Sequence, residues 1–256
     1  MNKNGHLAFG AAAGAASLYF MPEAVLQADQ LAPLVVVGMA ALAGLAPDFD
    51  HKTSTISNLI QLSTRRRRLS RTIGAILLLI GVLLLALPYV PWVPYNGELQ
   101  GSAKLWLGAG LFGIALSRIR SLILVAAGVA LIVAYRMYDW HWIAAFTGVT
   151  LLLTPALKHR GLIHTPEFSF ALSMGILSFT ELQPWYIEAG GQGLVVGWWA
   201  HLAGDLFGRD GIHSLFIPKL KLALRLFRNG SAGERTLSTL SWAFCLISLC
   251  VFWIGL

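Results

Sequence analysis

Long apolar segments separated by short polar stretches make up most of this chain. Each segment is continuously apolar, which predicts membrane-spanning helices; strands of a membrane barrel would alternate between apolar and polar residues. Nine spans are predicted, at about 7–22, 31–47, 73–90, 103–117, 119–135, 140–157, 166–183, 193–208 and 237–255. The predicted fold class is therefore all-α, a polytopic transmembrane helix bundle forming one integral membrane domain over residues 1–256.

The first predicted span is rich in small residues. Between Gly10 and Ala16 it contains only glycine and alanine. Small side chains allow helices in a membrane to approach closely. This span is therefore expected to pack inside the bundle.

The composition agrees with a membrane protein. The chain is 56% hydrophobic and 12% charged, about half the charged fraction of a soluble domain. Its two cysteines, Cys245 and Cys250, both lie in the last apolar run and indicate packing rather than a disulfide framework. The start lacks the basic region of a signal peptide, so the first apolar segment is expected to be retained.

The basic residues are distributed unevenly about the predicted spans. Of the 19 Lys and Arg residues, all except Lys104 and Arg136 fall on the side that carries the N-terminus. The positive-inside rule therefore predicts a multi-pass protein of a bacterial-type inner (plasma) membrane, with a cytoplasmic N-terminus and an extracytoplasmic C-terminus. The net charge of +7 is assigned to topology and to contact with membrane lipid, and no nucleic-acid partner is expected.

Seven ionisable residues lie at the predicted cytoplasmic ends of the apolar segments. Charged groups are costly there, and imidazoles combined with carboxylates are the ligands of divalent metals. Seven groups exceed the needs of one tetrahedral zinc, so a site for one to three divalent ions, Zn or alternatively Mn, is predicted. Its candidate ligands are His6, Asp48, Asp50, His159, His164, His201 and Asp205.

The local motifs support this grouping. His201 and Asp205 are four residues apart in an apolar helix and therefore share one face. Asp48 and Asp50 follow Pro47, which ends the second span; whether Asp50 or His51 faces the site is open. In the hairpin 158–165, two histidines flank a glycine, and Arg160 offers a planar fork suited to phosphate. Taken singly, these residues could also be topology determinants or helix-end groups.

These motifs, in this order, resemble the YdjM-type family of bacterial inner-membrane proteins, described as metal-dependent hydrolases. The family pattern is an N-terminal His, L-P-D-x-D, H-R-G-x-T-H-S, and H-x-x-x-D followed by G-[VI]-x-L-x-x-P. The corresponding segments begin here at His6, Leu45, His159, His201 and Gly211. Departures are Ile163 for Thr, Thr165 for Ser, and the inserted Ala46. The resemblance covers about 5–51 and 140–218, with 73–137 and 237–255 as additional spans.

The resemblance implies a membrane-embedded hydrolase, and a distant similarity to zinc-dependent phospholipase C implies a phosphoester substrate. A lipid headgroup or a membrane-associated phosphate compound fits a site at the cytoplasmic edge. Asp50 would be a bridging ligand or general base, and Arg160 would neutralise charge on the phosphate. Two alternatives remain: a metal or proton transporter, and a membrane protein with a purely structural metal site.

Overall fold

A computed structural model describes residues 1–50, 59–90, 92, 97–157, 161–209, 211–217 and 219–255, apart from the side chains at 49, 50 and 99. The described residues are mostly helical, which confirms the predicted all-α fold class. The α-helices are α1 (Lys3–Ser17), α2 (Glu23–Gln27), α3 (Ala32–Ala43), α5 (Thr64–Ala86), α6 (Gly97–Ser117), α7 (Ile119–Met137), α8 (Trp142–Leu153), α9 (Pro166–Thr180), α10 (Trp185–Phe207) and α11 (Ala232–Ile254). Three short 3-10 helices join them: η1 (Pro47–Asp50), η2 (Leu87–Tyr89) and η3 (Leu162–His164).

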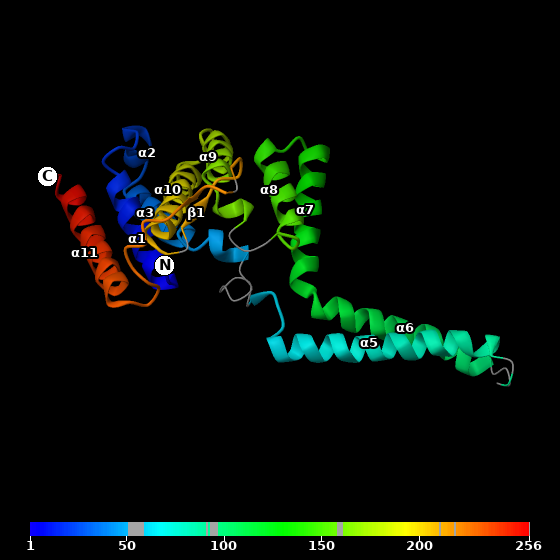
Figure 1. The fold of residues 1–256 in the computed structure, drawn as a ribbon. Coiled ribbons are helices and arrows are strands. Elements are labelled where there is room, and N and C mark those ends of the chain that lie inside the picture. The colour runs from blue at the N-terminus through cyan, green and yellow to red at the C-terminus, as the bar shows by residue number, and fades with distance from the viewer. Residues whose placement is uncertain are drawn as a thin grey trace.

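Helix α1 is the centre of the bundle. It contacts α3, α10 and α11, and α3 also packs along α10 (Figure 1). Most of the small residues of α1 are buried, as the sequence predicts. Where helices meet, the backbones touch because the residues are glycines: a Cβ atom on Gly10 would lie 2.5 Å from the carbonyl oxygen of Ala40.

The contact between α3 and α10 is equally close, and it gives a prediction for stability. A Cβ atom on Gly197 would lie 2.1 Å from the Ala40 carbonyl oxygen, so Gly197→Ala must push the two helices apart. We expect it to lower the free energy of unfolding by about 1–3 kcal/mol. Gly190→Ala in the same helix is the control, because its Cβ would meet nothing nearer than Met39 at 3.8 Å. Thermal unfolding in detergent measures both, and wild-type stability of Gly197→Ala would contradict this packing.

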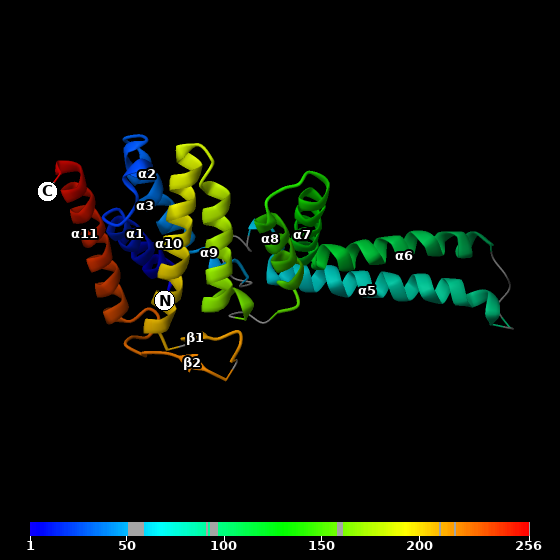
Figure 2. The same ribbon diagram turned by 90° about the horizontal axis from the view of Figure 1, so that it is seen from above.

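Helices α5 and α6 form a hairpin that extends away from the bundle. Figures 1 and 2 show it running across the direction of α7. Gly74 and Gly110 bring the two helices together, and the Ser70 hydroxyl donates to the Gly113 carbonyl at 2.7 Å. Outside the pair, the main contact of the hairpin is between α6 and α7.

Three helices in the described part of the chain are long and apolar enough to cross a membrane. They are Thr64–Tyr89, Ile119–Met137 and Ala232–Ile254, and the apolar helices Ala32–Ala43 and Trp142–Leu153 are shorter. Each of the nine predicted spans coincides with a helix, but coincidence with a helix does not establish a crossing. The span count of nine, and the direction of the termini, stay predictions.

One short ribbon departs from the helical pattern. Strands β1 (Ile212–His213) and β2 (Lys221–Leu222) pair antiparallel after α10. They lie beside the end of α10 that carries Asp205 (Figure 2). The ribbon falls between two predicted spans, where apolar periodicity gives no information on local structure.

Candidate metal centre

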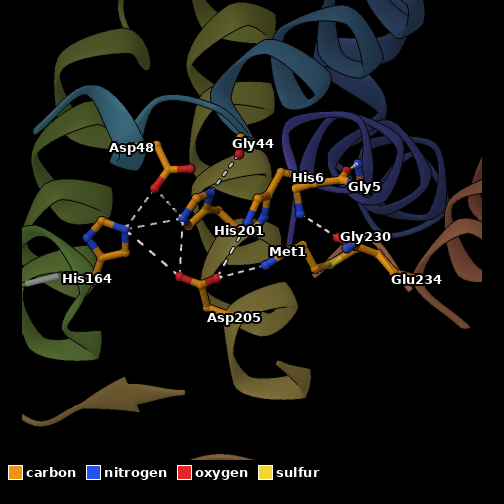
Figure 3. Close-up of polar contacts among 11 residues, drawn as sticks. Met1, Gly5, His6, Gly44, Asp48, His164, His201, Asp205, Gly230 and Glu234 are labelled. Atoms are coloured by element: carbon orange, nitrogen blue, oxygen red, sulfur yellow. Dashed lines mark hydrogen bonds and ion pairs between the residues drawn. The ribbon is translucent and has the colours of Figure 1, made fainter. Parts of the chain in front are cut away.

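Five of the predicted ligands converge in space, although they come from four separate elements (Figure 3). Four of these side chains are buried, with at most 2% of each residue exposed. The fifth, Asp48, has 33% of its side chain exposed and forms the open side of the cluster. The five are His6 of α1, Asp48 of η1, His164 of η3, and His201 and Asp205 of α10.

The donor atoms of the five side chains face one another. The Nε2 atom of His201 lies 3.3 Å from Nε2 of His164 and 3.5 Å from Oδ2 of Asp205. The Nε2 atom of His164 lies 3.5 Å from Oδ1 of Asp48. The Nε2 atom of His6 lies 3.5 Å from the other carboxylate oxygen of Asp205. The cluster is therefore continuous from His6 to Asp48.

The hydrogen bond from His201 to Gly44 decides which nitrogen of His201 faces the cluster. Its Nδ1 lies 2.7 Å from the carbonyl oxygen of Gly44. A carbonyl only accepts, so Nδ1 carries a proton, and Nε2 is the nitrogen left to face the cluster. Nε2 points toward carboxylate oxygens of Asp48, at 3.8 Å, and Asp205. With Nδ1 occupied by Gly44, Nε2 is the atom of His201 that could bind a metal ion.

The ligand atoms form two overlapping groups, each able to hold a metal ion. One group is His6, His201 and Asp205, and the other is Asp48, His164 and His201. The rings of His6 and His201 stack with centroids 3.9 Å apart. His201 belongs to both groups, so it is the ligand on which any pair of ions in this cluster would depend.

The environment of Asp48 favours its charged form. Burial raises the pKa of its carboxyl group, but the hydrogen bond with His164 and the charges of His201 and His6 lower it by more. The pKa of Asp48 therefore lies below its usual range, and the group is a carboxylate at neutral pH. An ionised oxygen is the form that binds a cation.

Two glycines that the motif reasoning did not single out shape the cluster. Gly44 caps α3, and a Cβ atom there would lie 2.6 Å from the carbonyl oxygen of His6. A Cβ atom on Gly204 would lie 3.2 Å from Nδ1 of His6. Both glycines therefore let α1 come close enough for His6 to reach His201. The role of Gly204 could have been predicted from the sequence, because this residue lies inside the His201–Asp205 motif.

A buried carboxylate holds the N-terminal end of α1. Glu234, in the first turn of α11, is fully buried and accepts hydrogen bonds from the backbone N–H groups of Asn2 and Gly230. Nearby, the Met1 amino group lies 3.3 Å from Asp205. The start of α1, one turn from His6, is thus fixed from two sides. Glu234 was not predicted, since its spacing matches no motif.

Other predicted residues fall outside this cluster or outside the described residues. His159 and Arg160, the side chain of Asp50, and His51 lie outside the described part of the chain, so their predicted roles stay predictions. His141 and His213 are not among the predicted ligands. The ring of His141 accepts from the Ile143 N–H and lies 3.3 Å from the Ser178 hydroxyl, and His213 lies in β1.

Comparison with known proteins gives a family assignment. The family model described as YdjM inner membrane protein matches residues 1–131, slightly more than half of the 256 residues. The match includes range 5–51, runs through most of range 73–137, which the motif comparison had left aside, and does not reach range 140–218. No curated protein and no solved structure matches the chain. With its apolar helices and this match, the chain is a membrane protein that belongs to the YdjM inner membrane protein family.

Proposed function

We propose that this protein is a metal-dependent hydrolase that acts on a phosphoester at the membrane surface. The observation that carries the proposal is the convergence of three imidazoles and two carboxylates, in which Nε2 of His201 faces both carboxylates. Ring nitrogens and carboxylate oxygens gathered in this way are the donor set that a divalent cation binds.

The spacing of the donor atoms also supports a metal. Two ligands at bond lengths of about 2.0–2.1 Å from a tetrahedral zinc lie roughly 3.3 Å apart. The separations from His201 to His164 and Asp205, 3.3 and 3.5 Å, are close to this value. Three imidazoles with two carboxylates suit zinc or manganese better than calcium, which prefers oxygen ligands alone. One ion or more would be held by His6, Asp48, His164, His201 and Asp205.

The chemistry follows from a partly open, charged site. A bound divalent ion supplies a polarising charge for a phosphoryl oxygen and lowers the pKa of a water molecule. Asp48 lies at the open side, where a substrate approaching from water or from the headgroup region would meet the cluster. Asp50, two residues further along the chain, is proposed as a bridging ligand or general base, and Arg160 as the group that neutralises charge on the phosphate.

The surroundings favour an enzyme over a transporter. A conduction path needs polar groups that continue through the membrane. Next to the cluster, the buried side chain of Trp198 instead packs with Leu202 and Phe168. The indole N–H of Trp198 in α10 donates to the Ser169 hydroxyl of α9 at 3.1 Å. This hydrogen bond fixes the apolar packing beside the cluster between the two helices.

The test combines metal content with turnover. Purified protein loaded with zinc or manganese is expected to release phosphate or headgroup from a panel of phosphoesters and phospholipids, and chelation is expected to stop it. Arg160→Ala should keep its metal, because guanidinium offers no lone pair, and lose about 10²-fold in rate. Arg160→Lys should recover part of the rate, since a point charge replaces a fork.

Three outcomes would contradict this assignment. Wild-type turnover in Arg160→Ala would remove that residue from the reaction. Tightly bound metal without hydrolysis of any substrate would favour a structural site. Metal-dependent ion flux into proteoliposomes, again without hydrolysis, would favour the transporter.

A further inference from the structure

A polar cavity lies at the base of the α5–α6 hairpin, where α6 meets α7. Its volume is about 180 Å³, several times the roughly 30 Å³ that one water molecule occupies in the liquid. None of the five converging ligands of the metal cluster lines it. The lining residues are Gln61, Arg67, Ser117, Arg118, Ile119, Arg120 and Ser121.

The cavity concentrates positive charge. Three of its lining residues are arginines, and the described residues that line it include no Asp or Glu. Arg67 donates through Nη1 to the Gln61 side-chain oxygen at 3.2 Å, which orients its guanidinium. Arg120 is buried, with 8% of the residue exposed. Guanidinium forks are matched to carboxylate and phosphate oxygens, so a charged cavity of this kind suits an oxyanion.

The positive-inside rule alone does not explain why Arg67 lines the cavity. Arg65, Arg66 and Arg68 are exposed, as the positive-inside rule requires for contact with headgroups and water. Arg67, in the same run, is only partly exposed and lines the cavity. The fold therefore places one of the four consecutive arginines at the cavity and leaves the other three exposed.

The surroundings favour a lipid as the source of the oxyanion. The cavity lies at the start of two candidate spans, Thr64–Tyr89 and Ile119–Met137, the level at which headgroups lie. From Arg67, the same face of α5 continues one turn later with Arg71. There an open apolar groove begins, lined by Arg71, Thr72, Ala75, Ile76 and Leu79. A phosphate in the cavity and an acyl chain along this groove would belong to one molecule.

We propose that this cavity binds the phosphate of an anionic phospholipid, with an acyl chain on the apolar groove of α5. The site is separate from the metal cluster and does not depend on hydrolysis. It would fix the base of the α5–α6 hairpin at the headgroup level, where the described residues make few contacts with the rest of the protein.

Binding of phosphatidylglycerol to the detergent-purified protein tests this, measured by native mass spectrometry and by the shift in melting temperature. Each guanidinium would make a charge-assisted hydrogen bond to the phosphate, so Arg67→Gln and Arg120→Gln should each weaken binding at least about tenfold. Arg65→Gln is the matched control: it removes the same charge two residues away, at an exposed position, and should change binding less than about twofold. If Arg120→Gln fails to fold, Arg67→Gln carries the test alone.

Competition identifies the source of the phosphate. Phosphatidylcholine, which has the same phosphate but no net charge, should bind at least about tenfold more weakly than phosphatidylglycerol. Inorganic phosphate should compete for the cavity yet bind more weakly than the lipid, since it lacks the chain. Equal losses in Arg65→Gln and Arg67→Gln would overturn the site. Binding of inorganic phosphate with no gain from the lipid would overturn the lipid assignment.

Discussion

His201→Ala is expected to release all the metal that the protein binds. His201 is the ligand common to both groups of three, and its Nδ1 bond to Gly44 holds Nε2 toward the other four side chains. Four-ligand zinc sites bind with about 10–16 kcal/mol, or roughly 3 kcal/mol per ligand, so losing one ligand costs at least about a hundredfold in affinity. Both groups lose this ligand at once.

Elemental analysis across a small variant series measures this effect. His6→Ala and His164→Ala each remove a ligand from one group only, and if two ions are bound, each variant should retain one of them. His141→Ala is the control for loss of a histidine far from the cluster and should keep the full metal content. Full occupancy in His201→Ala, His164→Ala and Asp48→Ala alike would end the metal-site hypothesis.

Asp205→Asn is expected to lower the metal affinity nearly as much as His201→Ala, although it keeps the shape of the side chain. Both oxygens of Asp205 are used: Oδ1 lies 3.5 Å from His6, and Oδ2 lies 3.5 Å from His201. The residue is buried, so water cannot replace the lost charge. Breaking a buried charged pair costs about 3–5 kcal/mol, which corresponds to at least about a hundredfold in metal affinity.

Two further Asp→Asn variants separate the effect of the lost charge on metal binding from an effect on folding. Asp48→Asn should weaken metal binding less, because a third of that side chain is exposed and water can compensate. Asp29→Asn changes a partly exposed residue that accepts from the Leu31 N–H and should leave metal content unchanged. Size-exclusion profiles and melting curves show whether each variant is folded. Wild-type metal affinity in a folded Asp205→Asn would exclude the carboxylate as a ligand.

The sequence predicted the helices well because each apolar run is long and continuous. The burial of α1 followed from its alanines and glycines, whose small size admits few other roles in a bundle. The direction of the α5–α6 hairpin could not be predicted. Apolar periodicity reports that a segment is a helix, and only contacts between helices decide how it is oriented.

For the candidate site, the sequence identified most of the converging side chains, but it did not identify the groups that hold them in place. His6, Asp48, His164, His201 and Asp205 stood out as polar groups in apolar surroundings, where each needs a reason to be present. The Gly44 carbonyl that orients His201 carries no such signal, since every residue has a carbonyl group. The role of Glu234 could not be predicted from the sequence either, because its partners are backbone N–H groups.

The close contact between α1 and α10 has a consequence for how the protein assembles. His6 and Asp205 are separated by most of the chain, and an ion bound by both would close that loop as a reversible cross-link. Such a link binds the assembled bundle but not the separated helices, so it stabilises the native state in proportion to the logarithm of the free metal concentration. Because synthesis runs from the N-terminus, α1 is made long before its partner α10. An ion held by both could therefore be captured only late, and metal loading would then be the step that locks the two ends of the bundle together.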